Sequence, residues 1–155
     1  MTGGGIEFRE GTATKEDIHA FLGECDAAFS PNLSRKVDID EYATKIRTLA
    51  RTFEAWSEDK LVGLVAAYMN DTATRISFIT SVSVTRAFAG RGIASALLDQ
   101  CLDRSRREGL TAVRLEVSLA SDRAIRMYRT FGFSEITRNG ETVSMELNID
   151  ETRKS

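Results

Sequence analysis

Two glycines in the segment Gly90-Arg91-Gly92 separate a strand-like stretch, Val82-Ser83-Val84, from a helix-like stretch that begins at Ile93. The first N–H groups of a helix have no acceptor within the helix, and the helix dipole adds about half a positive charge at that end. Glycine lets phosphate oxygens approach the chain closely and adopts backbone conformations that other residues avoid. The junction therefore predicts a site for an anion such as a pyrophosphate, with Arg91 as an additional charge.

Two other phosphate-binding motifs, and a purely structural strand-to-helix connection, are alternatives for this segment. A P-loop requires GxxxxGK[ST], and the absence of any Gly-Lys pair from the sequence excludes it. A dinucleotide-binding turn requires GxGxxG close after a strand; here Ser95 stands at the third glycine, and Glu116 falls near the place of a ribose-binding acid. The chain that remains is too short for the repeated units of that fold, so a dinucleotide-binding oxidoreductase is kept only as a weak alternative.

A second motif lies farther along the chain, in Ala124-Ile125-Arg126-Met127-Tyr128 and Phe131-Gly132-Phe133. Together with Gly90-Arg91-Gly92-Ile93-Ala94 after a Val-x-Val strand, it resembles the GNAT N-acetyltransferase superfamily. The usual signature there is [Arg/Gln]-x-x-Gly-x-[Gly/Ala], followed by Ala-x-x-x-Tyr-x-x-x-Gly-Phe. Ala89 replaces the basic or amide residue, and Ser121 replaces the usual Asn. Both departures concern side chains, so a grip made by backbone N–H groups is still expected.

The resemblance implies acetyl-CoA as co-substrate and a cleft between the strand of Val82 to Val84 and the strand of Val113 to Val117. Backbone groups of Val82 and Val84 are then expected to bind pantetheine, and the N–H of Val84 to face the oxyanion. The pyrophosphate is expected over the glycine turn and the helix start. The implied cofactor-binding residues are Val82, Val84, Gly90, Arg91, Gly92, Ile93, Ala94, Ser95, Ser121 and Tyr128.

Tyr128 and Glu116 are the candidates for the acid and the base of acetyl transfer. The role that the resemblance implies for Tyr128 is to protonate the departing thiolate, and a phenol with a pKa of about 10 keeps its proton at neutral pH. A tyrosine that only packs beside Phe133 is the alternative. An amine acceptor must also lose a proton, and Glu116, on the polar face of its strand, is the candidate base. A water relay, or an ion pair of Glu116 with Arg114, is the alternative there.

The sequence leaves the acceptor amine open. In the family the acceptor is selected by the loop between the first two helices and by strand ends; the corresponding candidates here are Arg35, Tyr42, Asn70 and Asp71. Arg35 has the charge for a carboxylate or phosphate and Asp71 for an amine, but turn chemistry or a solvated surface explains both equally well. The segment around Arg35 also faintly resembles acetyltransferases encoded with surface-polysaccharide genes, which implies an amino sugar as one acceptor.

Composition excludes several other classes of protein. The 155 residues, 42% of them hydrophobic, are enough for one domain, and a net charge of -2 gives no overall positive field for nucleic acid. The apolar run Leu61 to Met69 is about half the length of a bilayer span, and no basic, apolar leader precedes it, so a cytoplasmic protein without membrane contact is expected. Cys25, Cys101 and the lone His19 lack the spacing of a disulfide framework, a metal site or a histidine triad.

Periodicity predicts the elements that must position these residues. Strands are predicted over 6–10, 53–56, 61–68, 75–84, 113–117, 133–138 and 142–149, with helices after Thr14, after Asp38 or Asp40, over 93–109 and over 122–130. The order is typical of an α/β or α+β fold. With the resemblance, it predicts one GNAT-like domain over 6–150, with about four helices flanking a mixed, mostly antiparallel sheet of six to seven strands that becomes parallel at the helical crossover.

Further expectations concern the ends of the chain. Residues 1–5 are predicted to be a disordered lead-in and 151–155 a tail. Asn139-Gly140 predicts a hairpin turn between the last two strands. The segment Ser144 to Ile149 is expected as an edge strand through which a homodimer forms.

The function expected from all these features is direct transfer of acetyl from acetyl-CoA to a primary amine of a small molecule or peptide, within a ternary complex. A module that binds acyl-CoA without turnover is the second hypothesis, because Ala89 and Ser121 stand where stronger cofactor ligands are usual.

Overall fold

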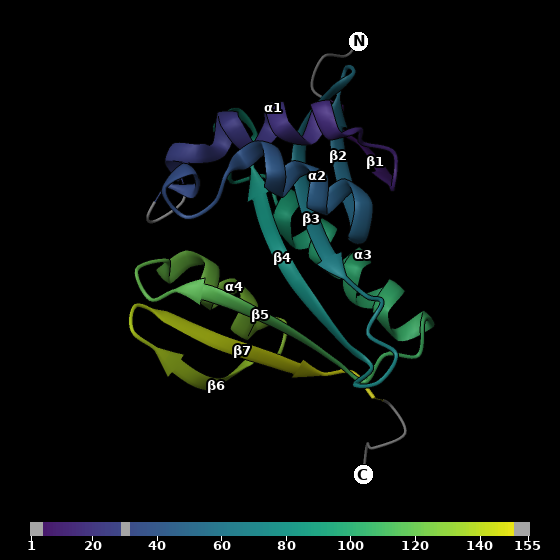
Figure 1. The fold of residues 1–155 in the computed structure, drawn as a ribbon, viewed down its shortest axis with the longest axis vertical. Helices are drawn as coiled ribbons and strands as arrows, with labels where there is room; N and C mark the ends of the chain where they lie inside the picture. Colours follow the sequence, from purple (N-terminus) through teal and green to yellow (C-terminus); the bar gives the residue numbers. More distant parts are fainter. Residues whose placement is uncertain (1–4, 29–31, 151–155) are drawn as a thin grey trace.

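The computed structural model describes residues 5–28 and 32–150. The predicted tail and all of the predicted lead-in except Gly5 lie outside the described residues. Along the described chain, strands and helices alternate in the predicted order β-α-α-β-β-β-α-β-α-β-β (Figure 1). Among its helices, none combines the length and the apolar character that crossing a membrane requires.

The element bounds agree with the predicted segments to within a few residues. The strands are β1 (Glu7–Glu10), β2 (Arg51–Ser57), β3 (Lys60–Tyr68), β4 (Ile76–Val84), β5 (Ala112–Ser118), β6 (Ser134–Asn139) and β7 (Thr142–Asn148). The helices are α1 (Lys15–Cys25), α2 (Ile39–Leu49), α3 (Ile93–Arg107) and α4 (Asp122–Thr130), with short 3₁₀ turns at η1 (Asp26–Ala28), η2 (Leu33–Arg35) and η3 (Arg86–Phe88).

The seven strands form one mixed sheet in the order β1-β2-β3-β4-β5-β7-β6. All neighbours are antiparallel except β4 and β5, which are parallel and are connected through α3. The predicted sheet is therefore confirmed. The expectation that Ser144 to Ile149 forms an edge strand is wrong, because the hairpin at Gly140 folds β7 between β5 and β6, and β6 takes the edge.

Helices cover the two faces of the sheet unequally. Helices α1 and α2 pack on one face over β2 and β3, where Leu22 and Ile46 contact a core that includes Leu64. Helices α3 and α4 cover the opposite face, where Leu98 and Tyr128 belong to a core that extends from β2 to β7. In the described chain, the first core contains no residue of β5, β6 or β7. The α1/α2 side of these three strands therefore stays free of helices (Figure 1).

Strands β4 and β5 pair over only part of their lengths. Their parallel register runs from Ile76↔Ala112 to Ile79↔Leu115 and then ends. The register of β3 with β4 shifts at the same level, so that Thr80 is an extra residue between Ile79 and Ser81. A β-bulge of this kind bends a strand. Beyond it the two strands diverge into a V, as the resemblance implied (Figure 1). We call the residues of β4 and β5 beyond the end of their mutual pairing, 80–84 of β4 and 116–118 of β5, the splay.

Candidate active site

The backbone of β4 in the splay presents free hydrogen-bonding groups toward β5. The N–H of Thr85 donates to the carbonyl of Val62 on β3 at 2.9 Å. Backbone groups alternate in direction along a strand, so Val82 and Val84 direct their N–H and C=O groups away from β3. On that side the pairing with β5 has ended. The backbone of Val82 and Val84 can therefore pair with an extended ligand that lies in the splay.

The glycine turn places a row of unsatisfied N–H groups at the start of α3. Gly90 and Gly92 have φ of 79° and 78°, and a Cβ on either would meet nothing within 4 Å. Glycine is favoured there by the left-handed backbone and not by lack of space. The first hydrogen bond of α3 runs from the N–H of Ala96 to the carbonyl of Gly92, and no N–H from Gly90 to Ser95 donates to a described residue. We call residues 90–95 the anion cradle.

Arg91 and Ser121, two residues of the cofactor signature, have side chains that make no hydrogen bond to the described chain. The Arg91 guanidinium is exposed and stacks over the Phe88 ring at 4.8 Å from its centroid, with no carboxylate partner in the described chain. Ser121 occupies the N-cap position of α4, but its side chain makes no capping hydrogen bond. Both side chains therefore have unused capacity for a ligand.

An open hollow of about 290 Å³ adjoins the anion cradle. It lies between the first turn of α3 and one side of α4. The lining residues are Ser95, Arg123, Arg126, Met127, Thr130 and Phe131. Ser95 belongs to both the cradle and the hollow, so the two are continuous. Sequence reasoning missed the hollow, since only the packing of α4 against the start of α3 creates it.

Tyr128 of α4 is packed by its ring and free at its hydroxyl. Only 6% of the residue is exposed, and its ring meets that of Phe133 edge to face, with centroids 5.8 Å apart. Burial raises the pKa of Tyr128 to about 12. Its hydroxyl makes no hydrogen bond to a described residue, yet it is not among the hydroxyl groups that are closed off from solvent without a partner. The ring of Tyr128 is therefore packed in the core, while the proton of its hydroxyl remains available.

Glu116 begins the part of β5 that no longer pairs with β4. It follows Leu115, the last residue paired with β4, and its exposed side chain lies on the other face of the sheet from Leu115. The alternative partner, Arg114, instead donates its Nε–H to Oε2 of Glu146 across β7 at 2.6 Å. Glu116 has no ion pair with any residue that the structure describes. Tyr128 and Glu116 therefore flank the splay from opposite faces of the sheet.

Tyr42 of α2 reaches the β-bulge at the start of the splay. Its hydroxyl donates to the backbone carbonyl of Thr80 at 2.6 Å and lies 2.7 Å from the Thr80 Oγ1. Burial raises the pKa of Tyr42 to about 12. The nearby Tyr68 hydroxyl and the Ser81 hydroxyl are buried and have no partner in the described chain. The predicted acceptor residue Tyr42 thus contacts the bulge through Thr80, a residue of the candidate site that strand periodicity did not indicate.

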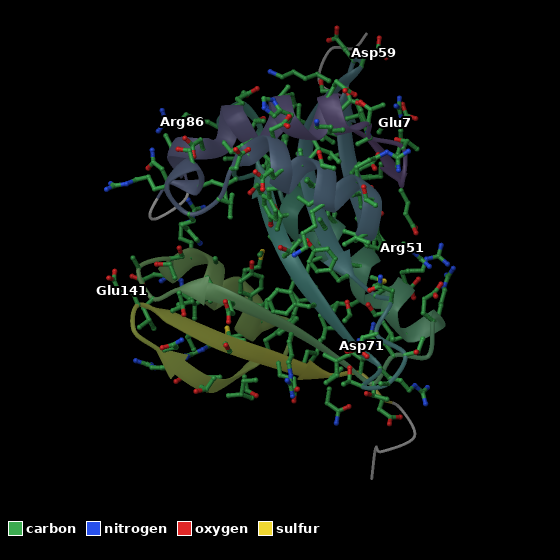
Figure 2. All side chains as sticks on the ribbon, viewed as in Figure 1. Glu7, Arg51, Asp59, Asp71, Arg86 and Glu141 are labelled. Atoms are coloured by element: carbon green, nitrogen blue, oxygen red, sulfur yellow. The ribbon has the colours of Figure 1, made fainter. Side chains whose placement is uncertain are left out.

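The acceptor candidates Asn70 and Asp71 lie before the first residue of β4, at the opposite end of this strand from the splay. The carboxylate of Asp71 accepts hydrogen bonds from the N–H groups of Thr74 and Ala73, which lower its pKa. Figure 2 shows Asp71 at the closed end of the V and Arg86 at the open end. The nine residues of β4 correspond to about 26 Å between these ends. The structure therefore does not bring Asn70 and Asp71 to the splay.

Arg35 belongs to η2, within the connection between α1 and α2. Figure 1 shows the described part of this connection on the side of the molecule where the V is open. Its side chain is exposed and has no partner among the described residues. Of the predicted acceptor residues, Arg35 and Tyr42 remain on the side of the open end.

The sequence matches the model of the acetyltransferase (GNAT) family over residues 17–133. This chain belongs to the GNAT acetyltransferase family. The matched region contains the splay, the anion cradle and Tyr128, so the family assignment and the geometry concern the same part of the molecule.

Individual relatives agree with this assignment. An uncharacterized N-acetyltransferase of Methanocaldococcus jannaschii is 28% identical over 139 residues, which cover 79% of this chain and 58% of that protein. The N-alpha-acetyltransferase MAK3 of Arabidopsis thaliana is 30% identical over 87 residues, covering 56% of this chain and 46% of that protein. The chain thus spans about half the length of these two relatives.

The fold is shared with yncA from Salmonella typhimurium, whose structure was solved with its cofactor acetyl-CoA. The TM-score is 0.74 at 19% sequence identity, and the match covers 96% of each chain. GNAT acetyltransferases take acetyl from acetyl-CoA. The residues of this chain fit that donor, since the splay offers strand-like pairing to pantetheine amides and the cradle offers unsatisfied N–H groups to phosphates.

Proposed function

We propose that this protein is an N-acetyltransferase that moves acetyl from acetyl-CoA directly to a primary amine. The observation that carries the proposal is the continuity of the splay with the anion cradle. Free backbone groups of Val82 and Val84 face the gap between β4 and β5, and the unsatisfied N–H groups of residues 90–95 follow along the same chain. An extended ligand with amides at one end and phosphates at the other matches this order.

The binding roles follow from these backbone groups. Val82 and Val84 hydrogen-bond the pantetheine amides as a neighbouring strand would. The N–H groups from Gly90 through Ile93 and Ala94 to Ser95 bind the diphosphate, because they lie at the positive end of α3. Ala89 carries no charge, so backbone N–H groups supply most of the binding free energy for the diphosphate. The Arg91 side chain adds a smaller contribution.

The chemical step uses the two residues that flank the splay. Glu116, directly or through a water molecule, takes a proton from the amine, and the amine nitrogen attacks the thioester carbonyl carbon. The N–H of Val84 stabilises the oxyanion that forms. When the intermediate collapses, the C–S bond breaks and Tyr128 gives its proton to the thiolate sulfur. The nitrogen gives up its second proton to water as the amide forms, Tyr128 recovers its proton from solvent, and Glu116 releases the proton that it took. The products are an amide, CoA and one proton.

The acceptor reaches the thioester across the helix-free face of β5 and β7. Glu116 is on this face and lacks a cationic partner in the described chain, which favours a positively charged amine over a carboxylate there. A peptide α-amine is the first acceptor to test, since one relative is named an N-alpha-acetyltransferase. An amino sugar or another small primary amine is the second.

A panel of amines with acetyl-CoA tests the proposed function. Peptides with free α-amines, amino sugars and polyamines are each mixed with enzyme, and thiol release is followed. We expect release that depends on both the amine and the enzyme, with an acetylated amine as product. A protein that binds acetyl-CoA but releases no thiol with any amine would instead be the acyl-CoA-binding module suggested by Ala89 and Ser121.

A thermal-stability titration distinguishes the proposed acetyltransferase from the remaining alternative, a dinucleotide-binding oxidoreductase. A ligand at a hundred times its dissociation constant adds about 2.7 kcal/mol to the free energy of unfolding. We expect this stabilisation from CoA and none from NAD. The cytoplasmic location and the homodimer stay predictions.

A further inference from the structure

We infer that Glu146 is a positioning residue for the proposed base, because it holds the guanidinium of Arg114 on β7 and so keeps Glu116 free for the acceptor amine. This inference rests on the proposed function, since it takes Glu116 as the group that accepts the proton. It assigns a role to an ion pair that lies outside the cofactor signature.

Arg114 and Glu116 share one face of β5. They stand on either side of Leu115, whose side chain belongs to the core beneath α3 and α4, so both point to the helix-free face. Side chains two residues apart on a strand are separated by about 6–7 Å. A long arginine side chain can span this distance, so Arg114 is able to reach Glu116 along the strand.

Glu146 gives Arg114 a closer partner across the sheet. The register of β5 and β7 places Arg114 directly opposite Glu146 and places Ser144 opposite Glu116. The Cβ atoms of directly opposite residues are only about 5 Å apart. The Nε–H of Arg114 donates to Oε2 of Glu146 at 2.6 Å. The guanidinium is therefore held beside β7, and Glu116 has no ion pair with any described residue.

The elements around Glu116 offer no other competing cation in the described chain. Residues 80–84 of β4 carry no charge, and the charged residue of β7 is the carboxylate already described. From α2, Lys45 lies over the ring of a β3 tyrosine at 5.3 Å from its centroid, and Tyr42 donates to the backbone of the bulge. Arg114 is thus the cation that the strands place next to Glu116.

Loss of the Glu146 carboxylate would remove the partner of Arg114 on β7. Glu116 is then the next carboxylate on the same face of β5. An ion pair with Arg114 would stabilise the ionised form of Glu116 and so weaken it as a base. The guanidinium would also place positive charge where a cationic amine has to approach. Glu146 prevents both effects.

Carbon-13 NMR titration of the protein without substrate tests the inference. The carboxyl resonance of Glu116 is assigned with Glu116→Gln and followed in the wild type, Glu146→Gln, Arg114→Gln and the double variant. We expect Glu146→Gln to lower the midpoint of this titration by about 0.3–0.7 pH units. Arg114→Gln should raise the midpoint at least about twice as much in the Glu146→Gln background as in the wild type, because Glu146 otherwise holds the guanidinium elsewhere.

Thiol release from acetyl-CoA gives the matching measurement of activity, with the amine of the panel that the wild type acetylates fastest. Glu146→Gln should lower kcat/KM for this amine by about three- to fivefold at low salt. The double variant with Arg114→Gln should recover most of the loss, and so should added salt. The control Glu135→Gln breaks a similar ion pair, with Arg138 at 2.7 Å, and should show the wild-type rate. Glu135 lies opposite Met145, on the other face of the sheet from Glu116.

Two outcomes would overturn the inference while the proposed function stands. Equal effects of Arg114→Gln in both backgrounds would show that the charges act independently and that Glu146 does not position the guanidinium. A loss of activity in Glu146→Gln that the double variant does not recover would show a structural role, which unfolding temperatures would confirm. If Glu116→Gln instead keeps full turnover, Glu116 is not the base, and the positioning role fails together with that part of the proposed function.

Discussion

Tyr128 combines a ring packed in the core with a free hydroxyl, as the proposed acid requires. Its ring packs against Phe133, while its hydroxyl has no hydrogen-bond partner among the residues that the structure describes. Tyr128→Phe removes only the hydroxyl and keeps the packing. We therefore expect turnover to fall by more than about tenfold while the dissociation constant for CoA stays within about twofold. Steady-state kinetics together with a CoA titration check this, and unchanged turnover would remove Tyr128 as the acid.

The raised pKa of Tyr128 fixes the sign of its pH dependence. With a pKa of about 12, the phenol keeps its proton well above the range of a free tyrosine. Turnover of the wild type should therefore show no decline between about pH 8 and pH 10 that is absent from Tyr128→Phe. A decline in that window confined to the wild type would show that the buried phenol ionises earlier than the structure implies.

Glu116 offers a second test at the residue scale. If it accepts the proton of the amine, Glu116→Gln should lower kcat/KM for the amine by about tenfold or more near neutral pH. The loss should shrink as the pH approaches the pKa of the amine, because more of the acceptor is then already uncharged. The matched control is Glu16→Gln, on the exposed first turn of α1. A loss that is independent of pH would argue for a role in binding instead.

Arg91 tests how far the backbone holds the phosphates. The cradle has N–H groups from six consecutive residues, 90–95, and only one arginine side chain. Arg91→Ala should weaken CoA binding by only a few-fold, since one exposed charge contributes about 1 kcal/mol or less. Calorimetric titration measures the change. Near-complete loss of CoA binding would show that the Arg91 side chain, and not the backbone, provides most of the affinity for the phosphates.

At the scale of elements, the start of α3 depends on the left-handed conformation of Gly92. Gly92→Ala meets no steric obstacle, but a non-glycine residue at φ of 78° costs about 1 kcal/mol. We expect lower stability and weaker CoA binding together, because the same backbone forms the cradle. Urea denaturation and CoA titration measure the two effects.

Gly23 in α1 provides the matched control for this change. It lies inside a helix with nothing within 4 Å of an added Cβ, and its φ is not positive. Gly23→Ala should stabilise the protein by about 0.5–1 kcal/mol and leave CoA binding unchanged. If both variants changed CoA binding alike, the conformation of Gly92 would not be the cause.

Close packing of α3 on the sheet also fixes where the cradle lies. A Cβ on Gly63 of β3 would come within 2.9 Å of the Ile93 side chain and 3.3 Å of that of Leu97. Only glycine at this position lets the first turn of α3 approach β3 so closely. The cradle is therefore positioned by the sheet as well as by its own turn.

At the scale of the whole molecule, Glu54 ties the β1–α1 connection to the sheet. Its buried carboxylate accepts hydrogen bonds from the N–H and hydroxyl of Thr12, the N–H of Ala13, the Thr52 hydroxyl and the Trp56 indole. Burial alone would raise the pKa of Glu54, but these hydrogen bonds outweigh it and lower the pKa. All partners are donors, so an amide nitrogen cannot replace the carboxylate oxygen.

Stability should therefore depend on Glu54 and on acid. Its contribution is present above the unfolded pKa of about 4.5 and is lost as the pH falls through the lower folded value. Glu54→Ala should cost about 3 kcal/mol at neutral pH, because buried donors lose their acceptor, and should flatten the acid dependence below about pH 4.5. Denaturation at several pH values measures both. An unchanged acid dependence would place the sensitive carboxylate elsewhere.

Local rules determined much of this protein from sequence. Periodicity located each strand and helix, Asn139-Gly140 located a hairpin, and the glycine turn indicated an anion site, because each depends on residues close together in the chain. The paired motifs indicated the family, which the match over residues 17–133 confirms. The roles of Tyr128 and Glu116 came with the resemblance and stay predictions.

Only the tertiary structure decided which distant residues meet. It placed β7 inside the sheet, ended the β4–β5 pairing at Ile79 and Leu115, and gave Arg114 the partner Glu146 instead of Glu116. It also packed α4 beside Ser95 to form the hollow with Arg123. Side-chain pairing and strand order depend on which surfaces bury each other, and no local pattern carries that information.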